Sequence, residues 1–263
     1  MITVPQTLGN EVGEAINALL KESDRFRNWD DIEVQALVHA IKKLQKVDAR
    51  QAFIRFGGLA AICGKVDDVV MYYDKALLLP GEAGTKREYW VSLGNVGLYS
   101  KAHEIGRWLL DPKRGFFAKI WDLAVSFGQV FTVWDRLPEA KKTYPDLTEV
   151  DFSLIERAAA VMESRGLTDE AIASVFDLMG EIQRLHGIMF SGTLVSSLKV
   201  MQPPEDPAYL YFALPLDASV DEIHTMNREL TKLVVERLSE GAFPEGLVAT
   251  FAKAHLIELR AAA

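Results

Sequence analysis

Four glycines recur at nearly constant intervals between stretches of helical periodicity. Gly64 and Gly166 lie 102 residues apart, which is three times 34, and Gly97 and Gly128 fall between them at intervals of 33 and 31 residues. Gly64 and Gly166 each follow an apolar helical stripe and precede a polar turn and a second stripe, where a residue with positive φ is needed. The spacing predicts consecutive α-helical hairpins. Residues 11–26 and 31–46 add a fifth pair of helices at the amino end.

The residues around these glycines show a position-specific pattern. Counted from Arg50 as the first position of a unit, a small residue stands at position 8, glycine at 15 and an aromatic residue at 24: Gly57, Gly64 and Tyr73. Counted from Phe152, positions 8 and 15 are again small, Ala159 and Gly166. The middle units depart from the pattern, with Trp90 at the small position and Gly106 at the aromatic one.

This pattern resembles the tetratricopeptide repeat family, whose 34-residue unit is a helix-turn-helix. The resemblance covers residues ~10–187 and implies a right-handed solenoid of α-α hairpins whose first helices line a concave surface. Packing of α-hairpins without a family relationship is the alternative. In either case we expect a mainly α protein.

The sequence changes character after Gly187. The prolines at 203, 204 and 207 interrupt any helix, and the aromatic-rich segment 209–216 is typical of a strand. Ser219 followed by Glu222 forms a capping box that begins a helix ending near Gly241, and residues 246–253 are expected to return as a strand. We therefore predict a helical domain over 1–187 and a small α+β subdomain over 188–263 with β-β-α-β order, packed on the last hairpin as a cap. An all-helical cap is the alternative.

Composition and charge exclude several classes of function. The formal net charge is −8, which argues against nonspecific nucleic-acid binding because that affinity comes from Lys and Arg. The longest nearly apolar stretch, residues 123–134, is well short of the roughly 20 residues that span a bilayer. A single cysteine, Cys63, has no disulfide partner in the chain, and no signal peptide is recognisable at Met1. These features predict a cytoplasmic protein without membrane contact.

Residues suited to catalysis or to cofactor binding form no recognisable pattern. No two of the five histidines have the i, i+4 spacing of a helical zinc site, and the glycine-containing segment 81–86 lacks the order of a phosphate-binding loop. We expect no metal and no cofactor and assign no catalytic residue. An enzyme housed in residues 188–263 is the least favoured of three hypotheses.

The leading hypothesis is a protein-protein interaction protein, either an adaptor, a chaperone-like protein or an immunity-type protein that binds a partner. Its acidic charge would suit a basic protein or peptide. A peptide- or ligand-sensing regulator, with the carboxy-terminal element as an output or dimerisation module, is the alternative. The resemblance implies that positions 2, 5, 9, 12 and 13 of each unit face the groove. From these positions the candidate binding residues are Ile54, Ile62, Arg87, Val91, Asn95, Asp122, Glu156 and Glu163.

Overall fold

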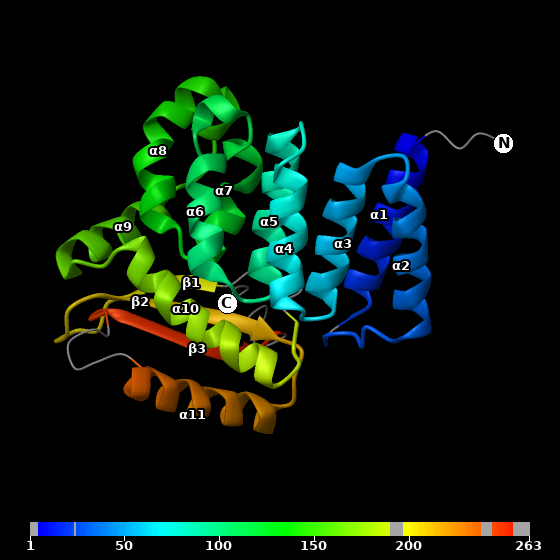
Figure 1. Cartoon of the computed structure of the whole chain (residues 1–263). Helices are drawn as coiled ribbons and strands as arrows, with labels where there is room; N and C mark the ends of the chain where they lie inside the picture. Colours follow the sequence, from blue (N-terminus) through cyan, green and yellow to red (C-terminus); the bar gives the residue numbers. More distant parts are fainter. Residues whose placement is uncertain (1–4, 24, 190–196, 238–243, 255–263) are drawn as a thin grey trace. The chain divides into compact units, whose positions relative to one another are not determined.

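A computed structural model of the chain describes residues 5–23, 25–189, 197–237 and 244–254. The protein is mainly α-helical, with one three-stranded sheet near the carboxyl end (Figure 1). Its contacts divide the chain into two units, which are described separately. Unit 1 comprises residues 1–97 and 183–193, and unit 2 comprises residues 98–182 and 194–263.

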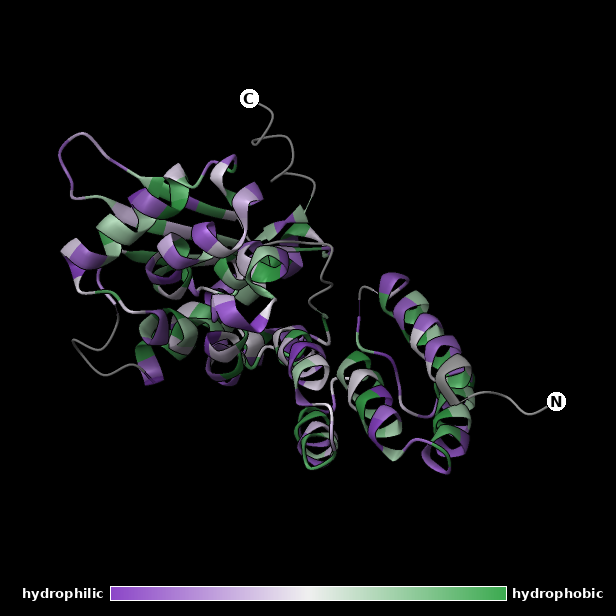
Figure 2. Ribbon diagram, turned by 90° about the horizontal axis from the view of Figure 1, so that it is seen from above, coloured by the Kyte–Doolittle hydropathy of each residue, from purple (hydrophilic) through white to green (hydrophobic). Residues whose placement is uncertain are grey.

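The described part of unit 1 has five complete helices that follow one another as antiparallel neighbours. They are α1 (Pro5–Lys21), α2 (Ile32–Gln45), α3 (Ala49–Ile62), α4 (Val66–Leu77) and α5 (Glu82–Asn95). Each helix packs on the next, and α1 and α5 also both pack on α3. The first helices of successive hairpins therefore form one row. Hydrophilic and hydrophobic residues alternate along these helices (Figure 2). The buried residues of α2 and α4 form one stripe each, whereas the central helix α3 is buried on most of its circumference.

The hairpin turns lie where the glycine spacing predicts them. Gly64, Gly97, Gly128 and Gly166 have φ values of 65°, 69°, 89° and 64° and separate α3 from α4, α5 from α6, α7 from α8 and α9 from α10. Residues other than glycine rarely adopt this left-handed conformation. The predicted glycine turns are confirmed at all four positions, and the packing of α3 on α4 and of α7 on α8 confirms hairpins at Gly64 and Gly128.

The small residue at position 8 of the first unit also has the predicted role. The ring of Tyr73 on α4 lies directly over Gly57 on α3, where an added Cβ would come within 2.5 Å of the ring. Tyr73 is fully buried and stacks on Tyr89 of α5, with 4.8 Å between ring centroids. The missing side chain at Gly57 thus lets one aromatic residue join three helices.

Unit 2 combines helical hairpins with the sheet. Its helices are α6 (Tyr99–Leu109), η1 (Pro112–Arg114), α7 (Phe117–Ser126), α8 (Val130–Thr143), η2 (Pro145–Thr148), α9 (Ser153–Arg165), most of α10 (Asp169–Leu185) and α11 (Val220–Arg237). The strands are β1 (Ser197–Met201), β2 (Tyr209–Leu216) and β3 (Leu247–Lys253). This is the predicted β-β-α-β order, so the all-helical alternative is wrong. The predicted helix end at Gly241 lies outside the described residues.

The sheet has the order β1-β2-β3, with β1 antiparallel and β3 parallel to the central strand β2. On one face, Phe212 of β2 meets Phe176 of α10 edge to face at 5.1 Å between centroids. At the outer edge of β3, the amide of Asn227 on α11 accepts a hydrogen bond from the Phe251 N–H and donates one to the Phe251 carbonyl, at 2.9 and 3.0 Å. The α11 side chain thereby occupies an edge that would otherwise offer free backbone groups.

The observed division of the chain does not coincide with the predicted boundary at Gly187. The strands share a unit with α6–α9, and the Phe212–Phe176 contact gives the cap its expected neighbour. Residues 183–189 instead return to unit 1, where the Phe26 N–H donates to the Gly187 carbonyl at 2.9 Å and Met189 joins the core. Such long-range hydrogen bonds and contacts set the division, and a local change in sequence character at Gly187 cannot reveal them.

Candidate functional site

A pocket of about 210 Å³ opens on the row of first helices in unit 1. Its wall is formed by one face each of α1, α3 and α5, with Tyr73 of α4 at its base. Five of the eight candidate binding residues line it: Ile54, Ile62, Arg87, Val91 and Asn95. Five of the eight positions that the resemblance implies therefore converge on one cavity.

Arg55 crosses the pocket wall and connects three helices. Its Nε donates to the Gly9 carbonyl of α1 at 3.3 Å, and its Nη1 lies 3.7 Å from the Glu88 carboxylate of α5. The side chain fits because α1 has no Cβ at Gly13, where an added carbon would come within 2.8 Å of the guanidinium. Arg55 is thus held in place and is not free to bind a ligand.

The base of the pocket is a buried hydroxyl pair. The Tyr73 hydroxyl and the Ser92 Oγ are 2.9 Å apart. Burial is the largest influence on Tyr73 and raises the pKa of its phenol, so the hydroxyl remains protonated at all physiological pH values. This pair is a neutral polar floor beneath the charged rim.

Asn95 lies on the wall at the carboxyl end of α5. Only 6% of the residue is exposed, and its Oδ1 has no hydrogen-bond partner among the residues that the structure describes. A buried amide oxygen without a partner costs about 1–3 kcal/mol. A ligand N–H group at the pocket would offset that cost.

Arg87 and Val91 stand one helical turn apart on the same wall. Arg87 is exposed and has no ion pair or hydrogen bond with the described part of the chain, whereas Val91 is half-buried. Ile54 and Ile62 are only 4% and 2% exposed, so they belong to the core and contribute apolar wall atoms. The pocket thus combines a free cation, an unpaired amide oxygen and an apolar surface.

The other three candidate residues do not line this pocket. Asp122 on α7 and Glu156 and Glu163 on α9 are exposed side chains of unit 2. Sequence reasoning did not find Arg55, Glu88 or the Tyr73–Ser92 pair. Arg55 follows the groove position Ile54 directly, so a polar residue next to such a position is the signal that could have found it.

Neither a metal-ligating cluster nor a membrane-spanning helix occurs among the described residues. Within them, no three His, Cys, Asp or Glu side chains are grouped so that they could hold a metal ion. Nor does any helix in the described segments have the length and apolar character needed to cross a lipid bilayer.

Comparison with family models, curated proteins and solved structures finds no match to this chain. The geometry of the pocket therefore carries the functional argument.

Proposed function

We propose that unit 1 binds an extended segment of a protein partner in the pocket on α1, α3 and α5, as an adaptor, chaperone-like or immunity-type protein would. The observation that carries the proposal is the convergence of five resemblance-derived positions on one cavity. Among the described residues, the Asn95 amide oxygen and the Arg87 guanidinium in this cavity have no hydrogen-bond or ion-pair partner. The proposal includes a relationship between these helical hairpins and the tetratricopeptide repeat family.

The chemistry of the wall suggests how the segment is held. Arg87 offers N–H donors to a carboxylate or a main-chain carbonyl, and the Asn95 oxygen accepts a main-chain N–H. Val91 and Ile54 offer apolar surface to a neighbouring side chain. Arg87 and Asn95 lie eight residues apart on α5, about 12 Å along the helix axis. An extended peptide offers carbonyl and N–H groups along its length and can meet both side chains, which an isolated ion cannot.

Net charge is distributed unequally between the units. Unit 1 has 13 acidic and 13 basic side chains, whereas unit 2 has 24 acidic and 16 basic ones, a net charge of −8. Attraction of a basic region of the partner would therefore act through unit 2, while the pocket of unit 1 makes the specific contact. A cytosolic location fits Cys63, the lone cysteine of the chain.

A selection of displayed random peptides on the whole protein tests the proposal. Peptides that bind the wild type should bind Arg87→Ala at least about tenfold more weakly, a loss of about 1.4 kcal/mol. Lys43→Ala removes an exposed charge from α2, which does not line the pocket, and should leave the affinity unchanged. Failure to select any peptide, or equal binding to wild type and Arg87→Ala, would contradict the proposal.

A further inference from the structure

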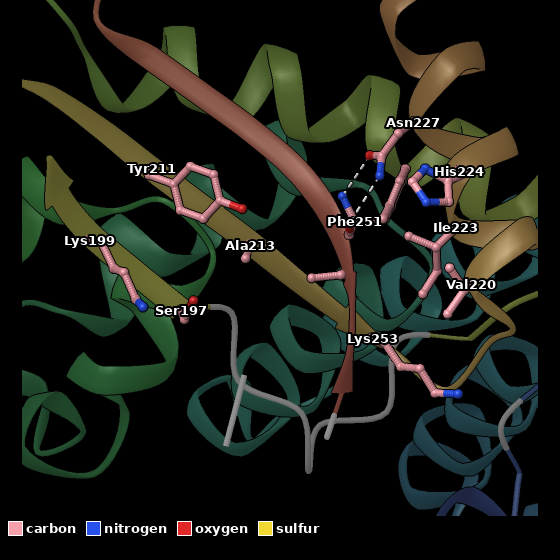
Figure 3. Close-up of a pocket in the computed structure, with 11 residues that line it drawn as sticks. Ser197, Lys199, Tyr211, Ala213, Val220, Ile223, His224, Asn227, Phe251 and Lys253 are labelled. Atoms are coloured by element: carbon pink, nitrogen blue, oxygen red, sulfur yellow. Dashed lines mark hydrogen bonds between the residues drawn. The ribbon is translucent and has the colours of Figure 1, made fainter. Parts of the chain in front are cut away.

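A second cavity, of about 250 Å³, lies in unit 2 between one face of the sheet and the first turns of α11. Figure 3 shows its lining residues on the three strands and on α11, with Lys199 on β1, Tyr211 and Ala213 on β2 and His224 on the helix. No candidate residue of the sequence analysis lines it. The cavity is distinct from the pocket of unit 1, because all of its lining residues belong to unit 2.

The two faces of the sheet differ in character, because side chains alternate along each strand. On one face Phe212 contacts Phe176 of α10, and the register places the buried Phe251 of β3 on the same side. The other face carries Tyr211 and its partner on β1, Lys199. Lys199 is the one charged residue that the register of the described strands places on this second face. The cavity lies over this second face.

Three polar side chains gather at the β1 side of the cavity. Lys199 is directly opposite Tyr211, and Ser197 precedes Lys199 by two residues on the same face. Figure 3 shows the Lys199 side chain directed toward Ser197 and the Tyr211 hydroxyl directed toward the centre of the cavity. None of these three groups has a hydrogen-bond or ion-pair partner among the described residues, and no Asp or Glu is among the lining residues that the structure describes. An ammonium group and two hydroxyls are together suited to one carboxylate.

The rest of the cavity is apolar. Ala213 of β2 and Ala252 of β3 lie on the same face and form a flat floor, because their side chains are short. Ile223 and Val220 of α11 line the far side, and Val220 is 50% exposed, so it leaves apolar surface for a ligand to cover. The distance from β1 to β3 is two strand spacings, about 10 Å. A flat floor of this width suits a bicyclic aromatic ring.

We propose that this cavity binds a planar aromatic monocarboxylate. Its carboxylate pairs with Lys199 and accepts hydrogen bonds from the hydroxyls beside it, and its ring lies on Ala213 and Ala252 against Ile223. One lysine on this face provides for one acidic group, and the apolar floor provides for the ring. The site gives the protein a small-molecule ligand in addition to its proposed peptide partner, and it does not depend on the pocket of unit 1.

Calorimetric titration of the whole protein with naphthalene-2-carboxylate tests the site. We expect saturable binding that is about three- to tenfold weaker in Lys199→Met, because the ion pair lies at an exposed side chain. Lys232→Met removes an exposed charge of α11 that does not line the cavity, and it should bind like the wild type. Circular dichroism confirms that each variant is folded.

An uncharged ligand of the same shape separates the contributions of ring and charge. Naphthalene-2-carboxamide should bind the wild type more weakly than the carboxylate does, and it should bind Lys199→Met and the wild type equally. Ala252→Leu adds a larger side chain to the floor and should weaken the binding of both compounds. Acetate has no ring and should not displace either compound.

Several outcomes would overturn the proposal. They are an absence of saturable binding up to about 5 mM naphthalene-2-carboxylate, displacement of either compound by acetate, and equal binding of the carboxylate to Lys199→Met and to the wild type. Equal weakening of carboxylate and carboxamide by Lys199→Met, or unchanged binding of both compounds to Ala252→Leu, would do the same. Arg87→Ala should bind the carboxylate like the wild type, so failure of this site is distinguishable from failure of peptide binding in unit 1.

Discussion

The two units of the molecule stabilise their hairpins by different means. In unit 1 the hairpins meet through stacked aromatic rings and small residues, such as Tyr73 over Gly57. In unit 2 buried polar side chains take part of this role: Asp169 of α10 and His103 of α6 each bind the backbone at the turn between α7 and α8. Polar contacts between elements depend on protonation and on exact partners, so unit 2 should be the more sensitive to pH and to single substitutions.

The direction of the pKa shifts agrees with this difference. Burial raises the pKa of the Cys63 thiol in unit 1 to about 12, so acid does not change its charge. In unit 2, burial is the main cause that lowers the pKa of His103 to about 4, despite the hydrogen bond that its Nε2–H donates to the Phe127 carbonyl at 2.6 Å. Among the described residues, the one buried histidine, which acid must protonate, therefore lies in unit 2.

Acidification should have the largest effect. A histidine whose folded pKa is below its unfolded value of about 6.5 binds fewer protons in the native state, so stability decreases as the pH falls from about 6.5 to about 4. The full loss from His103 is about 3 kcal/mol and should fall on unit 2. Hydrogen exchange at pH 7 and pH 4.5, expressed as protection relative to the intrinsic exchange rate at each pH, measures it. Protection should fall more in α6 and α7 than in α2 and α3, and an equal loss of protection in both units would contradict the comparison.

The carboxylate of Asp169 is expected to have the next largest effect. It accepts hydrogen bonds from the Phe131 N–H, the Thr132 N–H and the Thr132 hydroxyl at 2.9, 2.8 and 2.7 Å, and so caps the first turn of α8. Asp169→Ala leaves these three donors without a partner, which destabilises the protein, but it also removes a buried carboxylate whose pKa is raised by burial. The net loss of stability should be about 2 kcal/mol.

Asp177→Ala is the matched control on the same helix. Asp177 accepts one hydrogen bond, from the exposed Ser100 N–H at 3.1 Å, and its removal should cost less than about 1 kcal/mol. Urea unfolding curves compare the two variants. A cost for Asp169→Ala no greater than that for Asp177→Ala would show that the buried cap does not stabilise unit 2.

The corresponding test of unit 1 concerns close packing. Gly57→Ala places a Cβ within 2.5 Å of the Tyr73 ring and should destabilise the protein by about 1–2 kcal/mol. Gly84→Ala on α5 puts its Cβ in open space and should instead stabilise the protein by about 0.5 kcal/mol through helix propensity. Thermal unfolding gives both values, and the same sign for the two substitutions would contradict this account of the α3–α4 contact.

The hairpins and the terminal β-β-α-β element were predictable because their signals are local. A glycine with positive φ, a proline break and the Ser219–Glu222 cap, whose backbone N–H to Oγ hydrogen bond is 3.2 Å, each act within a few residues. The two-unit division was not predictable, because it depends on contacts such as that between Phe26 and Gly187. The same holds for the parallel pairing of β2 with β3, which joins strands separated in the chain by the whole of α11.

In the middle units of the repeat, one departure from the sequence pattern of the first unit has a structural cause. Gly106 stands at the position where the first unit has an aromatic residue, and an added Cβ there would lie 2.0 Å from the Gln129 Oε1. Gln129 is fully buried and donates through Nε2 to the His103 carbonyl at 3.3 Å. The glycine therefore makes room for a polar side chain from the next hairpin, which is consistent with the polar packing of unit 2.

The smallest expected change in stability belongs to the proposed binding pocket of unit 1, and its sign is informative. Asn95→Leu removes a buried amide whose oxygen has no partner and replaces it with an apolar side chain of similar size. Stability should be unchanged or higher by about 0.5 kcal/mol, whereas affinity for selected peptides should fall. This combination would indicate that Asn95 serves binding at the expense of stability, because leucine would pack better at this position. Urea unfolding and peptide titration of one variant measure both quantities. A clear loss of stability with unchanged peptide affinity would mark Asn95 as a structural residue and remove it from the binding site.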